Sequence, residues 1–123
     1  MIILLPWPPR ELSPNARVHW STKAKQAAQY KAQGWVSYNE AKKGESRLPQ
    51  PNMLLELRLT LHPPTRAARD IDNIIAQIKP AIDGIFRGIG GDDSQIRQTM
   101  AQMAHPVKGG QVVVEVLPLA RTS

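Results

Sequence analysis

The chain has 123 residues, 41% hydrophobic and 21% charged, which suits one globular domain spanning residues 1–123. It contains no cysteine, and this excludes a disulfide framework, a thiolate zinc site and a cysteine nucleophile. A net charge of +6 favours an anionic partner such as nucleic acid, although ordinary solubility also accounts for it.

The first predicted element is a short strand, Ile2 to Leu5, which the proline-rich run PWPP ends. This apolar stretch is shorter than a signal peptide or a membrane span requires, and no basic region precedes it. We therefore expect a cytoplasmic protein with no membrane partner.

A helix is expected from about Ser21 to Lys42, where the sequence becomes rich in alanine, lysine and glutamine. Ser21 or Thr22 is expected to cap its first turn, and Gly34 to bend or end it. The segment KKGESRLPQPN that follows is predicted to be a loop. The weak apolar face of this helix comprises Ala24, Ala27, Ala28, Trp35 and Tyr38.

The clearest strand lies within MLLELRLTLHPP, because apolar and polar residues alternate along it until two prolines end the pattern. Its apolar face is predicted to comprise Met53, Leu55, Leu57, Leu59 and Leu61.

The most regular element is a second helix, which Asp72 or Asn73 is expected to cap. Pro80 lies inside the pattern and predicts a kink, and the run GIGGDDSQ ends the helix. Its apolar stripe comprises Ile71, Ile74, Ile75, Ile78, Ile82, Ile85 and Phe86.

Two further strands are predicted at Ile96 to Met103 and Val112 to Leu117, and the run KGG between them favours a hairpin turn. The predicted fold class is therefore α+β, a small single domain with a mixed β-sheet and two main helices in the order β-α-β-α-β-β.

Five of the ten acidic residues lie between positions 70 and 93. If the backbone around Asp70 and Asp72 is extended, both carboxylates face the same side, and Asp92 or Asp93 adds a third oxygen donor. Such a set suits Mg²⁺, or Mn²⁺, with substrate phosphate completing the coordination. The alternatives are that Asp72 only caps a helix and that Asp92 and Asp93 only form a turn.

Lys79 lies seven residues after Asp72, on the same helix face and roughly 10 Å further along the axis. It is expected to pair with Asp83 at i, i+4, and a lysine beside a metal site can contact the scissile phosphate. The alternative is a solvated ion pair without a catalytic role.

Other chemistry-bearing residues give weaker signals. Trp7 and Trp20 are candidates to stack on unpaired bases, or they belong to the core. His19, His62 and His105 are expected to be structural or solvent-facing. No phosphate-binding loop or dinucleotide fingerprint is present, so no nucleotide cofactor is expected.

These motifs resemble the RusA family of Holliday-junction resolvases, small endonucleases common in phages and prophages. The similarity covers LPWPP, the Asn15-Ala16-Arg17 loop, RDIDN, the segment from Lys79 to Asp83, GDDSQI and KGGQVVVEV. The resemblance implies a bacterial or phage-encoded homodimer that binds four-way junction DNA and nicks two opposing strands symmetrically with Mg²⁺.

The resemblance also implies that Asp70, Asp72 and Asp93 hold the metal ion and that a lysine assists catalysis. In the family pattern this lysine follows the second aspartate by four residues, and that position here is Ala76. Lys79 is interpreted as its equivalent after a three-residue insertion.

The predicted function is thus a crossover junction endodeoxyribonuclease active in DNA recombination and repair. Two alternatives remain: a non-catalytic protein that binds junction or duplex DNA, and a metal-dependent nucleotide phosphohydrolase. Contacts to the DNA backbone are expected from Arg10, Arg17, Lys23, Lys25, Arg66 and Arg69.

Overall fold

The alternation of leucine with polar residues produces strand β2 (Leu55–His62) in the computed structural model, which describes residues 1–119. Each buried leucine of this strand is at most 2% exposed and belongs to the single hydrophobic core. Met53 precedes the strand and is only partly buried. The four buried positions are Leu55, Leu57, Leu59 and Leu61.

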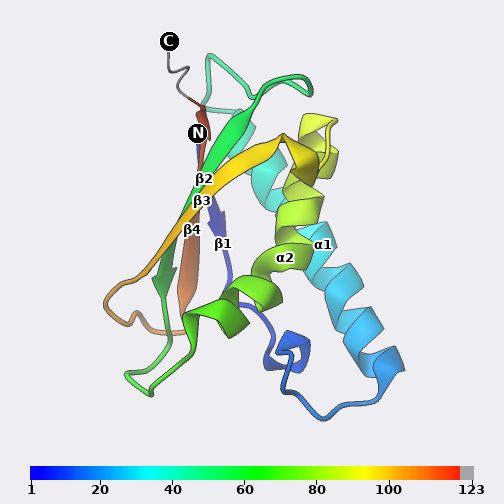
Figure 1. Ribbon diagram of the computed structural model, residues 1–123, viewed down its shortest axis with the longest axis vertical. Helices are drawn as coiled ribbons and strands as arrows, with labels where there is room; N and C mark the ends of the chain where they lie inside the picture. Colours follow the sequence, from blue (N-terminus) through cyan, green and yellow to red (C-terminus); the bar gives the residue numbers. More distant parts are fainter. Residues whose placement is uncertain (120–123) are drawn as a thin grey trace.

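The sheet contains β1 (Ile2–Leu5), β2, β3 (Ile96–Met103) and β4 (Gln111–Pro118), in the spatial order β1-β4-β2-β3. Strand β4 runs antiparallel to both β1 and β2, whereas β3 runs parallel to β2. Two long helices cover one face of this sheet (Figure 1). The predicted α+β class, mixed sheet and order of elements are confirmed.

The predicted hairpin between the last two strands is wrong, because β2 lies between β3 and β4. Gly109 and Gly110 do turn the chain, with φ angles of 78° and 74°. The connection they belong to passes the end of β2, where the amide of Val107 donates to the carbonyl of Pro63. The two glycines therefore reverse the direction of the chain, but they do not determine which strand pairs with β4.

Helix α2 (Ile71–Ile89) buries the predicted isoleucine stripe, with Ile78 and Ile85 fully inaccessible to solvent. Pro80 lies inside the helix, and α2 changes direction along its length in Figure 1, as the sequence predicts. The helix ends at Gly90, which adopts the left-handed conformation with φ of 91°.

Helix α1 (Trp20–Lys42) begins one residue earlier than predicted, and neither Ser21 nor Thr22 caps it. The cap is His19, whose Nδ1 accepts a hydrogen bond from the backbone amide of Ser21 at 3.1 Å. Of the predicted apolar face, Tyr38 is buried and Ala27 packs against the core, whereas Trp35 is 48% exposed. The buried residues are Tyr30, Gly34, Ser37 and Tyr38.

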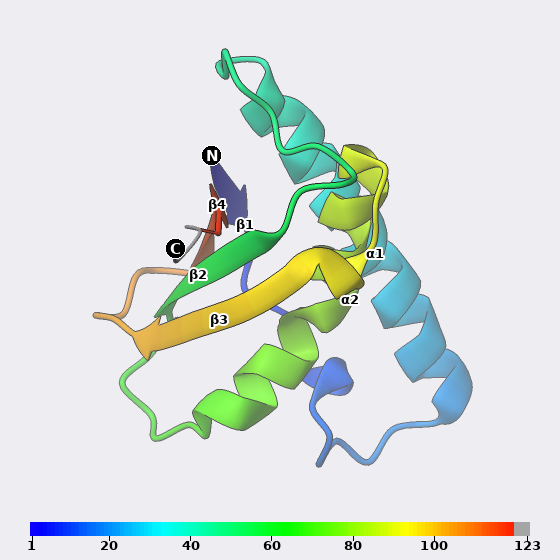
Figure 2. The same cartoon turned by 45° about the horizontal axis from the view of Figure 1, so that its top comes forward.

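Gly34 neither bends nor ends α1, because it is the point at which the two helices touch. A Cβ atom at Gly34 would lie 2.0 Å from the carbonyl oxygen of Ala81, and one at Gly84 would lie 1.9 Å from that of Lys31. The backbones of α1 and α2 therefore pack directly against each other, and Figure 2 shows the helices side by side.

The proline-rich segment after β1 is fixed to both helices. The hydroxyl of Tyr30 donates to the carbonyl of Pro6 at 2.8 Å, and burial raises the pKa of this tyrosine. The side-chain amide of Gln77 donates to the carbonyl of Pro9 at 3.2 Å, just before the short helix η1 (Arg10–Leu12). Across residues 1–119, no helix combines the length and apolarity that crossing a membrane requires.

Candidate functional site

The residue that caps the start of α2 is Asp70, not Asp72 or Asn73 as predicted. The backbone of Asp70 is extended, and its Oδ1 accepts a hydrogen bond from the amide of Asp72 at 2.9 Å. Asp72 already lies in the first helical turn, so the two aspartates do not share an extended backbone. Both carboxylates are exposed at the positive end of the helix dipole, which offsets part of their repulsion.

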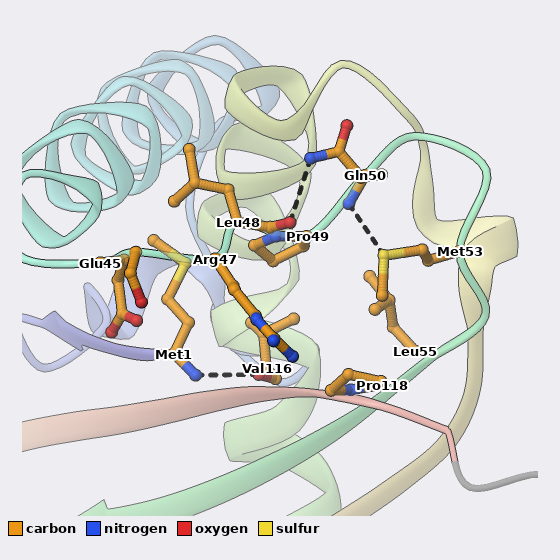
Figure 3. A pocket seen from close by; sticks show the side chains of 11 residues that line it. Met1, Glu45, Arg47, Leu48, Pro49, Gln50, Met53, Leu55, Val116 and Pro118 are labelled. Carbon is orange, nitrogen blue, oxygen red and sulfur yellow. Dashed lines mark hydrogen bonds between the residues drawn. The ribbon is translucent and has the colours of Figure 1, made fainter.

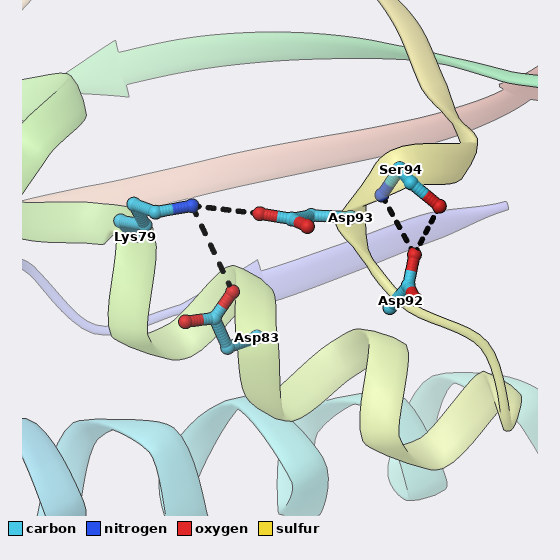
Figure 4. Close-up of polar contacts among 5 residues, drawn as sticks. All are labelled: Lys79, Asp83, Asp92, Asp93 and Ser94. Carbon is cyan, nitrogen blue, oxygen red and sulfur yellow. Dashed lines mark hydrogen bonds and ion pairs between the residues drawn. The ribbon is translucent and has the colours of Figure 1, made fainter.

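The opposite side of the site is the short helix η2 (Asp93–Gln95), which follows the turn at Gly90. Asp93 Oδ2 accepts a hydrogen bond from Lys79 Nζ at 2.8 Å, and Lys79 Nζ also lies 4.0 Å from Asp83 Oδ1 (Figure 4). The predicted pair with Asp83 is confirmed, whereas the closer contact with Asp93 was not predicted.

The pKa of Lys79 is raised, chiefly by its hydrogen bond to Asp93, with the charges of Asp83 and Asp93 contributing and partial desolvation opposing. Lys79 is therefore a permanently charged ammonium group at neutral pH. It has three N–H donors, and the two carboxylates occupy at most two of them.

Asp92 has a different role from its neighbour Asp93. Asp92 caps η2, because its Oδ1 accepts hydrogen bonds from the hydroxyl and from the backbone amide of Ser94 (Figure 4). These bonds, the hydroxyl first, lower the pKa of the Asp92 carboxyl. The turn interpretation therefore holds for Asp92, and Asp93 alone of the two is directed at Lys79.

Gln95 holds η2, and with it Asp93, in place. Its buried side-chain amide donates to the carbonyls of Gln50 and Met53, both at 2.8 Å. A Cβ atom at Gly91 would lie 1.8 Å from the side-chain oxygen of Gln95, so the chain passes close to this amide. The sequence contained Gln95 only within the motif GDDSQI, and nothing in that motif pointed to its distant partners.

Ala76 and Lys79 line the same hollow of about 400 Å³ between α1 and α2. Lys23 and Asp83 also line it. A lysine at position 76 and a lysine at position 79 therefore face the same part of the surface, one helical turn apart.

A metal site composed of Asp70, Asp72 and Asp93 is compatible with Mg²⁺ by chemistry, because all three are exposed carboxylates and Mg²⁺ prefers hard oxygen donors. The three are not gathered: across residues 1–119, no group of three or more His, Asp or Glu side chains is close enough to hold a metal ion. The cation that Asp93 contacts in this structure is Lys79.

The residues predicted to contact DNA differ in whether their charged groups already form hydrogen bonds within the protein. Arg69 folds onto its own loop, donating to Thr65 and to the carbonyl of Ala67, and its guanidinium lies 5.8 Å from the ring of Trp7. Lys23 donates to the carbonyl of Ser13 at 3.3 Å. Arg10, Arg17, Lys25 and Arg66 are exposed or partly exposed.

The two tryptophans predicted to stack on unpaired bases differ in their exposure to solvent. Trp7 is half-buried beneath Arg69, whereas Trp20 is 75% exposed beside the ring of His19. His62 donates from Nδ1 to the carbonyl of His105 at 2.9 Å, which agrees with a structural role for this pair. Of the two tryptophans, Trp20 is the one with a face available for stacking.

A hollow of about 590 Å³ lies between the loop after α1 and the ends of β2 and β4 (Figure 3). Met1, whose amino group donates to the carbonyl of Val116 at 3.1 Å, and Arg47 are among its lining residues. None of the predicted site residues lines this hollow.

No model of a protein family matches the chain. The chain is 37% identical over 121 residues to a protein of Xylella fastidiosa (strain Temecula1 / ATCC 700964), which is described as an uncharacterized protein. The match covers 93% of this chain and 74% of that protein.

Proposed function

This chain belongs to the same family as the Xylella fastidiosa protein, and we propose that it is a Mg²⁺-dependent, structure-selective DNA endonuclease of the RusA type. It resolves Holliday junctions by paired symmetric nicks in DNA recombination and repair. The description of the relative names no activity, so the proposal rests on the residues of this chain.

The observation that carries the proposal is the ion pair between Lys79 and Asp93, 14 residues apart in sequence. With Lys79 interpreted as the displaced lysine, these two residues are the equivalents of the catalytic lysine and the last metal-binding aspartate of the RusA pattern, and they come from two separate motifs. Ala76 lines the same hollow as Lys79, which supports the interpretation of Lys79 as the displaced family lysine.

In this proposal Asp70, Asp72 and Asp93 hold the metal ion, and Asp92 does not, because its Oδ1 is already bonded to Ser94 and caps η2. A bound Mg²⁺ lowers the pKa of a coordinated water and neutralises charge on the phosphate. Lys79 supplies a fixed positive charge, and its remaining N–H donor is available to a phosphate oxygen.

We further propose that two copies of the chain act as a homodimer, since two symmetric cuts on a four-way junction suit a two-fold assembly. The exposed cations Arg10, Arg17, Lys25 and Arg66 are assigned to the DNA backbone. Arg69 is assigned to its own loop, because its guanidinium is already bonded there.

The test is cleavage of a synthetic four-way junction, with linear duplex of the same sequence as control. Two symmetrically placed nicks that require Mg²⁺ or Mn²⁺ are expected. Folded, junction-binding protein that makes no nick with either metal would overturn the endonuclease assignment. Sedimentation of the protein with and without junction measures the proposed dimer.

A non-catalytic junction-binding protein is the second candidate. It is favoured by one observation: Asp93 is paired with Lys79, and no metal-holding group exists among residues 1–119. This candidate predicts junction binding that is unchanged by EDTA and is never followed by cleavage. The same assay therefore separates the two functions.

A further inference from the structure

The outward side chains of α1 and α2 line three hollows along the seam where the helices touch. Their volumes are about 400, 400 and 390 Å³, and Lys31 lines all three. The direct backbone contact at Gly84 fixes the position of Lys31, because its carbonyl oxygen faces that glycine. The three hollows therefore adjoin one residue, Lys31, and together they are here called the helix seam.

One end of the helix seam combines an aromatic plane with two cations. It is lined by Ala28, Lys31, Ala32, Trp35 and Arg87. The side chain of Trp35 is 48% exposed, and the two alanines leave an apolar floor beside it. Trp35 was predicted to lie in the apolar face of its helix, and the structure instead places it at this surface.

The two cations at this end, Lys31 and Arg87, have surroundings different from those of Lys79. Among residues 1–119, neither Lys31 nor Arg87 has a carboxylate within ion-pair distance, in contrast to Lys79. Carboxylates do line the adjoining hollow, but Asp83 and Asp93 are paired with Lys79, which lies outside that hollow, and Asp92 is bonded to Ser94. An anion is therefore favoured at the end that holds Trp35.

We propose that this end of the helix seam binds an unpaired nucleotide of single-stranded DNA. The base stacks on Trp35, and Lys31 and Arg87 contact its flanking phosphates. The inference rests on the proposed DNA substrate, and it adds a route for a strand that leaves the Lys79 and Asp93 site. A paired base does not expose its face to an indole, so the site selects unpaired over duplex DNA.

Binding of a fluorescein-labelled thymidine oligomer of about twelve nucleotides tests the site by anisotropy, in EDTA and over a range of salt. The double variant Lys31→Gln/Arg87→Gln is expected to reduce the slope of log affinity against log salt by about 1.4, since two phosphate contacts are lost. The control Arg47→Gln/Lys108→Gln removes the same charge elsewhere, from the hollow near Met1 and the β3–β4 connection. It is expected to keep the wild-type slope.

Trp35→Leu is expected to weaken oligomer binding about tenfold, and Trp35→Phe to restore most of it, because phenylalanine also stacks. Photocrosslinking with an oligomer that contains 5-iododeoxyuridine is expected to modify the peptide that carries Trp35. Circular dichroism confirms that each variant is folded before it is compared.

Equal salt slopes for the two double variants, or an equal effect of Trp35→Leu and Trp35→Phe, would overturn the nucleotide site. Equal losses for the oligomer and for a blunt duplex would also overturn it and indicate a general phosphate surface. Junction cleavage by the wild type is scored separately. If the wild type cleaves junctions but Lys31→Gln/Arg87→Gln binds the oligomer like the wild type, only the nucleotide site in the helix seam is overturned. If oligomer binding depends on Lys31 and Arg87 but the wild type does not cleave junctions, only the endonuclease assignment is overturned.

Discussion

Lys79 on α2 and Asp93 on η2 form an ion pair of 2.8 Å. The turn at Gly90 reverses the chain after α2, and Gln95 anchors the returning segment so that Asp93 faces the middle of the helix. This relationship unites two motifs that the sequence presents separately. It also distinguishes Asp93, which contacts Lys79, from its neighbour Asp92, which is bonded to Ser94.

Asp93 and its neighbour Asp92 provide a matched pair of variants. Asp93→Asn is expected to abolish junction cleavage, because it removes a proposed metal-binding carboxylate that faces Lys79. Asp92→Asn is expected to keep cleavage within about threefold, because Asp92 bonds only to Ser94. Gel assays of both variants on the same junction, with binding measured in EDTA, compare them. Equal loss of cleavage in the two variants would refute the separate roles.

Asp72→Asn is expected to abolish cleavage while junction binding stays equal or becomes tighter, since a negative charge near the DNA is lost. Its carboxylate takes no part in capping α2, so the fold is expected to remain. Cleavage rates measured with Mg²⁺ and junction-binding curves measured in EDTA test the two effects. Wild-type cleavage by this variant would show that the metal assignment is wrong.

The variant Lys79→Met tests the role of the ammonium group independently of metal binding. Cleavage is expected to fall on the order of 10²- to 10³-fold, the effect of removing one donor to a reacting oxyanion. Binding of Mn²⁺, followed by electron paramagnetic resonance, is expected to stay equal or to tighten, because Asp93 loses its competing cation. Unchanged cleavage would transfer the role to another basic group, and lost Mn²⁺ binding would contradict the competition.

The pH dependence at Asp92 follows from its lowered pKa. A carboxyl whose pKa falls on folding contributes stability above its unfolded pKa of about 3.9 and loses it as the pH drops through the folded value. Ser94→Ala removes the hydroxyl bond and is expected to raise the pKa towards its ordinary value. Titration of the Asp92 side-chain carbon signal by NMR measures both proteins. Coinciding titration curves would contradict the capping bond.

The contact between the helices predicts a large difference between two glycine substitutions. Gly84→Ala is expected to reduce the free energy of unfolding by about 1–3 kcal/mol or more, because its Cβ meets the carbonyl of Lys31. Gly44→Ala is the control, since nothing lies within 4 Å of a Cβ there. Urea unfolding of both variants measures the difference. Similar stabilities would mean that the helices separate without cost.

The elements of this fold were predictable where one residue pattern repeats over many positions. Leucines at every second position of β2 and isoleucines at helical spacing in α2 specify their structure locally, and both were found where expected. Helix starts were less predictable. His19 caps α1 in place of Ser21 or Thr22, and Asp70 caps α2 in place of Asp72 or Asn73. Several residues at each start are able to cap, and packing selects one of them.

By itself, the sequence determined the α+β class, the order of elements and the candidate residues, since these depend on periodicity and residue chemistry. Only the tertiary structure decided that β2 lies between β3 and β4, that α1 packs against α2 at Gly34, and that Lys79 pairs with Asp93. Each of these is a contact between segments distant in the chain. Local propensity carries no information about such contacts, because burial of the whole core determines which segments meet.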